Sequence, residues 1–233
     1  MPPLAHTSYM ICATQRPDSN LLCEALADTG VAGHPTEYFL PENQDTLCQR
    51  WGVSTEVEFV DKVIERGSSP NGVFGVKVMM GDGYFDHVID TLSRSRQLGS
   101  EDLPAPQLVR ATFPNLHHIW MTRRNKVRQA VSWWKAIQTD VWGRSRGEHA
   151  VARKEPVFDF DAIDSLVQAV ALKETSWQEY FADSDSVPLV VVYEDFLQAY
   201  EETVIGILEY LDVPVPQHLP QGAMRLQRQA DKL

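Results

Sequence analysis

The sequence has few cysteines, no long apolar run and a shortage of basic residues. Its three cysteines, Cys12, Cys23 and Cys48, lack the paired CxxC spacing of a zinc site or a redox pair. Cys12 falls in an apolar run and Cys23 in a helical pattern, so we expect buried thiols and a reducing compartment. Because no stretch of about 18 apolar residues occurs and no signal-like start is present, we expect a soluble, cytoplasmic protein without a membrane span.

Basic residues are outnumbered, with 21 Lys and Arg against 32 Asp and Glu, and the formal net charge is −11. Nonspecific nucleic-acid binding needs a broad basic surface, so we expect no nucleic-acid partner. An anionic ligand would have to meet a local basic pocket. Cations gather in two segments, residues 122–129 (TRRNKVRQ) and residues 143–154 (GRSRGEHAVARK), and the second is equally typical of a solvated face.

The glycine-rich phosphate loops are missing as well. Neither G-x-x-x-x-G-K-[ST] nor G-x-G-x-x-G occurs, which excludes kinases and dehydrogenases of those types.

What the chain does contain is an α/β pattern. With 43% hydrophobic residues it can bury a core, and we expect a single domain over residues 1–233. Continuous apolar runs predict strands, helical spacing predicts helices between them, and this alternation is typical of a parallel sheet buried on both faces. The strands are expected at 8–13, 71–80, 116–122 and 188–195, and the helices at 19–30, 54–66, 82–96, 125–142, 159–182 and 200–211.

Local signals refine this pattern. Ser19 is the expected N-cap of the first helix, and Gly30 its C-terminal stop. Residues 38–52, 97–115 and 143–158 are expected to be loop insertions or lids, since the last two carry Pro, Gly, Ser and charge without a clear period. One apolar stripe on each long helix is expected to face the core: Val127, Ala130, Val131, Trp134, Ile137 and Val141 on one, and Ile163, Leu166, Val167, Val170, Trp177 and Phe181 on the other.

The first strand is followed by a segment suited to an anion. Residues 14–20 (TQRPDSN) supply Arg16 as a fixed cation and place Ser19 and Asn20 at the start of a helix. Ligands bind outside the carboxyl ends of parallel strands, where a helix N-terminus offers free N–H groups. Taken alone, the segment is more typical of an ordinary helix start.

A second strand end has the same character. Cations follow residues 116–122, and the next helix carries Arg128 and Ser132 one turn apart, although Arg128 on this pattern also fits a solvated position. Two strand ends that are each suited to bind an anion suggest a ligand with two separated phosphate-like groups.

Longer runs resemble a known family. Residues 15–39 (QRPDSNLLCEALADTGVAGHPTEYF), 71–79 (NGVFGVKVM), 129–142 (QAVSWWKAIQTDVW) and 226–231 (LQRQAD) are similar to the bacterial trehalose 2-sulfotransferase family, among the sulfotransferases that use 3′-phosphoadenosine 5′-phosphosulfate (PAPS). Residues 191–196 (VVYEDF) resemble the wider superfamily. The resemblance implies a P-loop-like three-layer α/β fold, transfer of a sulfuryl group to a hydroxyl of a carbohydrate or other small acceptor, no metal, and a homodimer.

The resemblance also implies roles for individual residues. Arg16, Ser19 and Asn20 would bind the 5′-phosphosulfate of PAPS, while Arg123 and Ser132 would bind the 3′-phosphate, with Arg124 competing for the place of Arg123. Tyr193 would pack near the adenine and Arg228 near the phosphates. These residues are expected to share one crevice.

Glu37 matches the position of the family's catalytic base. The acceptor hydroxyl must lose its proton as it attacks sulfur, and a carboxylate within hydrogen-bond reach can accept it, while Arg16 stabilises the leaving group. His34 is the rival base, since histidine titrates near neutrality. His117 and His118 point to opposite faces of a strand, and His118 is expected in the core. Lys77 either meets the sulfate or extends to the sheet edge.

Two positions depart from the family. Pro17 and Asp18 replace Ser-Gly, and proline removes an N–H donor while Asp18 brings a carboxylate toward an anion. Asp18 either weakens donor binding or turns away to cap the helix. The alternative function is therefore a catalytically impaired binding protein of this fold. A metal-dependent nucleotide transferase would need Asp18 or Asp82 as a metal ligand, without support from a Walker-type lysine.

The acceptor is expected to contact residues 38–52, 81–86 and 143–158. Trp51 or Trp142 would stack on a sugar ring there, although each is also a plausible core residue.

Overall fold

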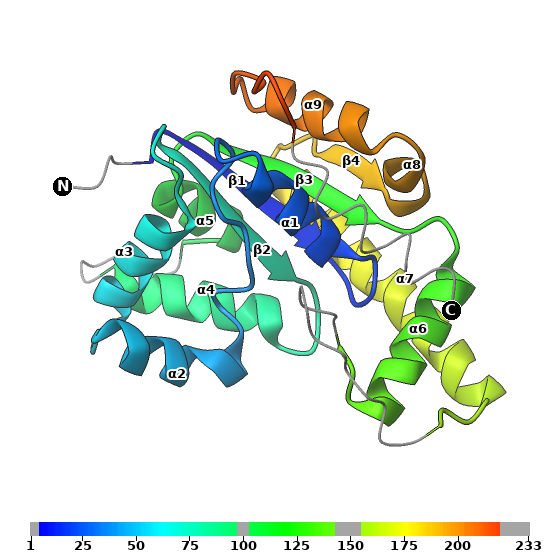
Figure 1. The fold of residues 1–233 in the computed structure, drawn as a ribbon. Coiled ribbons are helices and arrows are strands. Elements are labelled where there is room, and N and C mark those ends of the chain that lie inside the picture. Colours follow the sequence, from blue (N-terminus) through cyan, green and yellow to red (C-terminus); the bar gives the residue numbers. More distant parts are fainter. Residues whose placement is uncertain (1–4, 97–102, 143–154, 220–233) are drawn as a thin grey trace.

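A four-stranded parallel sheet forms the centre of the molecule in a computed structural model that describes residues 5–96, 103–142 and 155–219. The strand order is β2-β1-β3-β4, and all three pairings are parallel (Figure 1). The strands are β1 (Thr7–Ala13), β2 (Val73–Met79), β3 (Leu116–Thr122) and β4 (Leu189–Val192). Every residue of β1 is buried, as expected for a strand with neighbours on both sides and helices over both faces.

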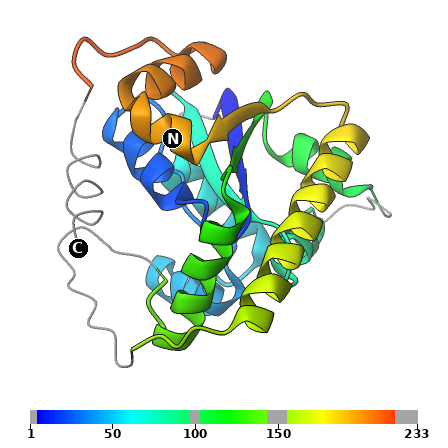
Figure 2. The ribbon, with the colours of Figure 1, turned by 90° about the vertical axis from the view of Figure 1, so that its right-hand side faces the viewer.

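Helices cover both faces of the sheet (Figure 2). Helices α1 (Ser19–Asp28), α8 (Tyr193–Gln198) and α9 (Tyr200–Tyr210) bury one core, built around Leu22, Leu26 and Phe196. On the other face, a second core includes Phe59, Phe74 and Trp177. The helices that contribute to this second face are α3 (Glu56–Gly67), α4 (Tyr84–Ser95), α5 (Ala105–Thr112) and α7 (Phe160–Asp183). The predicted α/β fold with a central parallel sheet flanked by helices is confirmed.

The register brings the carboxyl ends of the strands to one edge of the sheet. Ala13 at the end of β1 pairs with Met79 of β2, and Thr122 at the end of β3 pairs with Val192 of β4. Helix α6 (Lys126–Thr139) starts at this edge and packs along α7, so that the two helices extend past the sheet (Figure 1). Loops leaving this edge carry the candidate site.

Two segments expected to be loops contain helices. Helix α2 (Pro41–Trp51) occupies most of residues 38–52, and α5 lies within 97–115. Proline is typical of loops, but both helices carry it in the first turn, where its missing N–H removes no hydrogen bond of the helix. Each helix also buries few residues, which leaves little apolar period to detect: α2 buries none, and α5 buries Leu108 and Val109. Residues 143–154 lie outside the described ranges.

Three smaller expectations also need correction. Asp18, not Ser19, is the N-cap of α1, and the last predicted strand ends at Val192 because Tyr193 begins α8. Helix α6 buries Gln129, Ala130, Trp133 and Ala136. Of the predicted stripe, Ala130 is buried, Val131, Trp134 and Val141 are half-buried, and Val127 and Ile137 are 58% and 45% exposed. The contacts of α6 with α7 and with the loop after β1 determine which face of the helix is buried. The predicted stripe of α7 is buried or half-buried.

Two of the cysteines match their prediction. Cys12 and Cys23 are buried, whereas Cys48 is only half-buried, and all three are free thiols. Burial raises the pKa of Cys23 to about 12, which keeps this thiol protonated and unreactive. Within the described ranges, no helix is both long enough and apolar enough to cross a membrane.

Candidate active site

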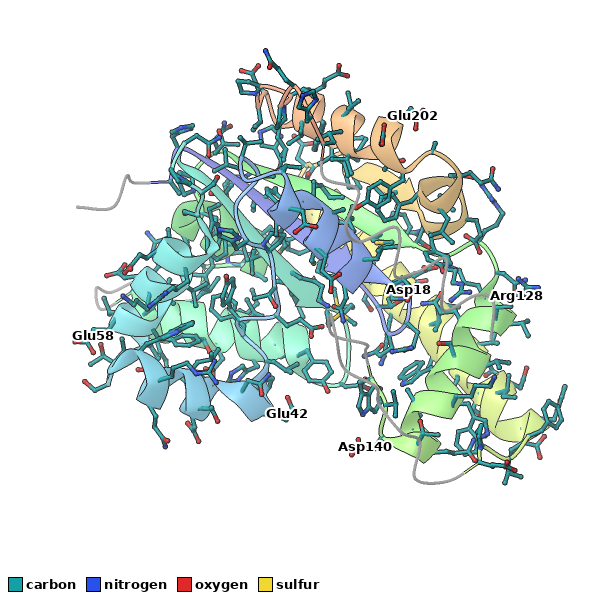
Figure 3. The ribbon with its side chains drawn as sticks, viewed as in Figure 1. Asp18, Glu42, Glu58, Arg128, Asp140 and Glu202 are labelled. Carbon is teal, nitrogen blue, oxygen red and sulfur yellow. The ribbon has the colours of Figure 1, made fainter. Side chains whose placement is uncertain are left out.

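The candidate site lies at the carboxyl edge of the sheet, where the segments after β1, β2 and β3 meet. Figure 3 shows Asp18 near the middle of the molecule, between α2, which carries Glu42, and α6, which carries Arg128 and ends just before Asp140. Most of the charged side chains that the sequence predicts for the site come from this edge. The geometry of the loop after β1 decides how they meet.

The loop at residues 14–18 is fixed by buried polar side chains. Gln129 of α6 is fully buried, and its amide donates to the Thr14 hydroxyl (3.0 Å) and to the Gln15 carbonyl (2.7 Å). The Gln15 side chain in turn accepts a hydrogen bond from Lys173 (3.0 Å) and donates one to Asp82 (3.0 Å). The loop is thus held from α6, from α7 and from the segment after β2.

The backbone of this loop is left-handed at two positions. Arg16 and Asp18 both have φ of 63°, on either side of Pro17. A left-handed residue followed by helical ones turns successive N–H groups to the same side, as in anion-binding nests. Pro17 lacks an N–H, but Asp18, Ser19 and Asn20 keep theirs at the positive end of α1. The loop retains the backbone form of an anion site.

Arg16 joins two of the predicted anion-binding segments. Its Nε donates to the Ser132 hydroxyl at 3.1 Å, across 116 residues of sequence, and its Nη1 donates to the Trp142 carbonyl. Burial lowers the pKa of Arg16, while Asp18 raises it and Arg123 lowers it further. Arg16, Asp18 and Arg123 therefore form one cluster of charges.

Arg123 and Arg124 point in different directions. The Arg123 guanidinium lies 4.6 Å above the ring of the buried Tyr193, 3.7 Å from Asp18 Oδ2 and 3.9 Å from Glu194 Oε1. Arg124 is exposed and pairs with Asp195 at 2.7 Å. Only Arg123 faces the loop after β1, so geometry separates two residues that the sequence left as alternatives.

A hollow of about 530 Å³ opens at the start of α6. Glu194 lines it from α8, and the other lining residues are Arg124, Asn125, Lys126, Val127 and Arg128. Arg128 thus lines this hollow, one helical turn from Ser132.

Lys77 connects Asn20 with Glu37. It is only 4% exposed near the end of β2, yet its ammonium lies 3.1 Å from the Glu37 carboxylate and donates to the Asn20 amide oxygen. Its backbone N–H donates to the Thr36 carbonyl at 3.0 Å, which aligns residues 36–37 with β2. Of the two roles considered for Lys77, the structure favours the one inside the site.

Glu37 opens onto a small hollow. Its side chain is 30% exposed, and Leu40, Lys77 and Tyr84 are among the neighbouring lining residues. Burial raises the pKa of Tyr84, and the carboxylates of Glu42, Asp82 and Glu37 raise it further. Tyr84 therefore stays protonated and can donate or accept a hydrogen bond at this hollow.

The other candidates lie elsewhere or serve the core. His34 is not among the described residues that line the Glu37 hollow. His118 is 3% exposed and bonded to Ser186 and Tyr180, as predicted for a core histidine. Trp51 stacks on Phe59, so its contacts are those of a core residue. Trp142 is 49% exposed and touches Arg16 through its carbonyl, and Arg228 lies outside the described ranges.

Sequence reasoning missed Gln15, Gln129 and Lys173. One feature of the sequence could have indicated Gln129: it is a polar residue on the same helix face as Ala136 and Trp133, which α6 buries. In the three described ranges, no group of three or more His, Cys, Asp or Glu side chains gathers as a metal site would require.

Comparison with known proteins identifies the family. The model of the Stf0 sulphotransferase family matches residues 8–233. The chain belongs to the Stf0 sulphotransferase family. Its relatives include trehalose 2-sulfotransferase of Mycolicibacterium smegmatis, 32% identical over 252 residues that cover 97% of this chain and 91% of the relative. The trehalose 2-sulfotransferase of Mycobacterium tuberculosis is 29% identical, covering 96% and 90%. This chain is thus a sulfotransferase-family enzyme, and the recognition made from its motifs is confirmed.

Proposed function

We propose that this Stf0 sulfotransferase transfers the sulfuryl group of PAPS to a hydroxyl of a sugar, with Glu37 as general base. One observation carries the proposal: the Lys77 ammonium contacts both Glu37, the candidate base, and Asn20, a candidate ligand of the donor. A base and a donor-binding group therefore lie on either side of a single buried cation. Sulfuryl transfer needs this closeness, because deprotonation and attack on sulfur occur in one crevice.

Arg16, Ser19 and Asn20 are the proposed ligands of the 5′-phosphosulfate. The first N–H groups of α1 and the left-handed backbone at Asp18 support this role, since both favour bound anions. Arg123 and Ser132 are the proposed ligands of the 3′-phosphate. Among the described residues, the carboxylates nearest to Arg123 lie at 3.7 and 3.9 Å, so a phosphate can offer it shorter hydrogen bonds.

Tyr193 acts through Arg123 in this proposal. Its ring is buried beneath the guanidinium, which it holds in a cation–π contact, and so it positions Arg123 instead of stacking on the adenine.

The proposed reaction is a direct displacement at sulfur. The acceptor oxygen forms a bond to sulfur as its proton passes to the Glu37 carboxylate. The bond from sulfur to the bridging oxygen breaks, and adenosine 3′,5′-bisphosphate leaves with that electron pair. Charge then grows on the leaving oxygen, where Arg16, Lys77 and the N–H groups of α1 stabilise it.

The acceptor is proposed to be a sugar on the evidence of the relatives, which are named trehalose 2-sulfotransferases. The Glu37 hollow supports this assignment because carboxylates and the Tyr84 hydroxyl can bind sugar hydroxyls. Trehalose is the first acceptor to test.

The test combines donor binding with transfer. We expect calorimetric titration with adenosine 3′,5′-bisphosphate to show micromolar binding that does not change when magnesium is removed. Incubation with PAPS and trehalose, followed by mass spectrometry, should then yield a sulfated sugar. Binding that requires magnesium, or absence of binding, would contradict the proposed donor. Binding without transfer to any of a panel of sugars would favour an impaired binding protein.

The base is tested with a matched pair of variants. Glu37→Gln should bind the bisphosphate like the wild type and lose at least about a hundredfold in turnover. Glu202→Gln removes an exposed carboxylate from α9, on the other side of the sheet, and should retain turnover. Equal activity of both variants would show that Glu37 is not the base.

A further inference from the structure

Asp18 occupies an unusual place for an acidic residue. It directly precedes α1 with φ of 63° and ψ of 34°, a left-handed conformation that glycine adopts freely and that Asp and Asn tolerate better than other residues. Its side chain makes no capping hydrogen bond to the first turn of α1, although Asp is among the best N-caps. Helix capping therefore does not explain why a carboxylate stands here.

The carboxylate contacts Arg123. Asp18 Oδ2 lies 3.7 Å from Arg123 Nη1, and both side chains are largely shielded from water, with exposures of 31% and 14%. Glu194 approaches the same guanidinium at 3.9 Å. Arg123 thus faces two carboxylates in the protein itself, at the position where the proposed function requires a phosphate.

Arg16 lies close enough to belong to the same cluster. Arg16 interacts electrostatically with both Asp18 and Arg123, so the Asp18 carboxylate offsets the repulsion between the two guanidinium groups. Arg16 is held separately by Ser132 and by the Trp142 carbonyl, whereas the contacts of Arg123 within the described part of the chain are two long carboxylate contacts and the ring of Tyr193. Removal of Asp18 should therefore change the ligand affinity of Arg123 more than that of Arg16.

We infer that Asp18 is an internal counter-ion of Arg123 that competes with the 3′-phosphate of the donor and sets the selectivity of the site for 3′-phosphorylated nucleotides. This inference rests on the proposed function, since it assumes that Arg123 is the ligand of the 3′-phosphate. A bound 3′-phosphate must displace the carboxylate or share the guanidinium with it. A nucleotide without that phosphate leaves the Asp18–Arg123 pair intact.

Two ligands and one substitution test the inference. Asp18→Asn keeps the shape and the tolerance for left-handed backbone while removing the charge. We expect this variant to bind adenosine 3′,5′-bisphosphate about tenfold more tightly in calorimetry, or about 1.4 kcal/mol. Its affinity for adenosine 5′-monophosphate should change less than about threefold. A bisphosphate affinity that is unchanged or lower would overturn the inference.

The control is Asp212→Asn, a second aspartate with left-handed φ, which lies after α9. It changes the net charge of the chain by the same amount and should alter neither affinity. If Asp212→Asn tightened bisphosphate binding as much as Asp18→Asn, the effect would come from overall charge, and the inference would be wrong.

A double-mutant cycle with Arg123→Met connects the effect to its partner. In the wild-type background, loss of Arg123 should lower bisphosphate affinity only about threefold, because its charge is already balanced; in the Asp18→Asn background the loss should exceed about tenfold. Equal losses would overturn the inference while leaving the proposed donor intact. If neither wild type nor Asp18→Asn binds the bisphosphate, the proposed donor is wrong and the inference falls with it.

Discussion

The Lys77 ammonium lies 3.1 Å from the Glu37 carboxylate, at the end of an otherwise apolar strand. A lysine that is 4% exposed is retained only when its charge is balanced and its hydrogen bonds are made. Glu37 supplies the charge, and Asn20 supplies a further acceptor. The pair thus connects the helix after β1 with the loop before α2, two segments that the proposed reaction requires together.

Replacement of Lys77 by methionine should remove the polar contacts that link these two segments, while a side chain of similar volume fills the space. We expect Lys77→Met to weaken binding of adenosine 3′,5′-bisphosphate at least about tenfold, because a cation and the anchor of Asn20 are lost together. Calorimetry measures this effect. Lys62→Met, which removes a half-buried lysine of α3 paired with Glu65, is the control and should bind normally. Unchanged binding in Lys77→Met would show that Lys77 does not serve the donor.

Lys173 of α7 holds the loop after β1 through its contact with Gln15. Its ammonium contacts Gln15 at 3.0 Å and Asp82 at 2.5 Å, and lies 4.4 Å from the ring of Trp133. Lys173→Met should lower the free energy of unfolding by about 1–2 kcal/mol, toward the lower end of the range for charged hydrogen bonds because Asp82 is half exposed to water. Urea denaturation measures this loss, and Lys135→Met, an exposed lysine of α6, should show none.

The same variant distinguishes positioning from bulk stability. Since Gln15 directly precedes Arg16, Lys173→Met should also weaken bisphosphate binding at temperatures where the variant is fully folded. A destabilised variant with wild-type affinity would limit Lys173 to a role in stability.

Gly33 shapes the turn that leads to Glu37. A Cβ atom at Gly33 would lie 2.4 Å from the Gly67 carbonyl oxygen and 2.7 Å from the Val73 carbonyl oxygen. The backbone is also left-handed there, with φ of +72°. Backbone atoms cannot move aside as a flexible side chain would, so Gly33→Ala should cost of the order of 3 kcal/mol in unfolding free energy. The contrasting variant is Gly206→Ala within α9, where a Cβ meets nothing within 4 Å. It should stabilise the protein by about 0.5–1 kcal/mol. Equal stabilities would contradict the steric account.

The sequence predicted the parts of this molecule that depend on local pattern. The apolar runs located the four strands, and the strand-end cations Arg16 and Arg123 do meet at one edge, because parallel strands bring their carboxyl ends together. The buried face of α6 was predicted only in part, since Gln129 is buried and donates hydrogen bonds to the Thr14 hydroxyl and the Gln15 carbonyl. No periodicity can report such a contact between residues more than a hundred positions apart. The choice between Arg123 and Arg124 likewise depended on the distant partners Tyr193 and Asp195.

His118 should make the stability of the protein depend on pH. It is buried between Tyr180 and Ser186, and burial, with smaller contributions from Arg110 and His117, lowers its pKa to about 4. An unfolded histidine titrates near 6.5, so as the pH falls the unfolded chain takes up the proton before the folded chain does. Stability contributed by neutral His118 is complete above about pH 6.5 and decreases toward pH 4. Between pH 7.5 and pH 5 the loss should be about 2 kcal/mol of unfolding free energy, measured by urea denaturation. His118→Gln should be less stable at pH 7.5 yet lose less on acidification, because glutamine does not titrate. An equal loss in wild type and His118→Gln would assign the pH dependence to other groups.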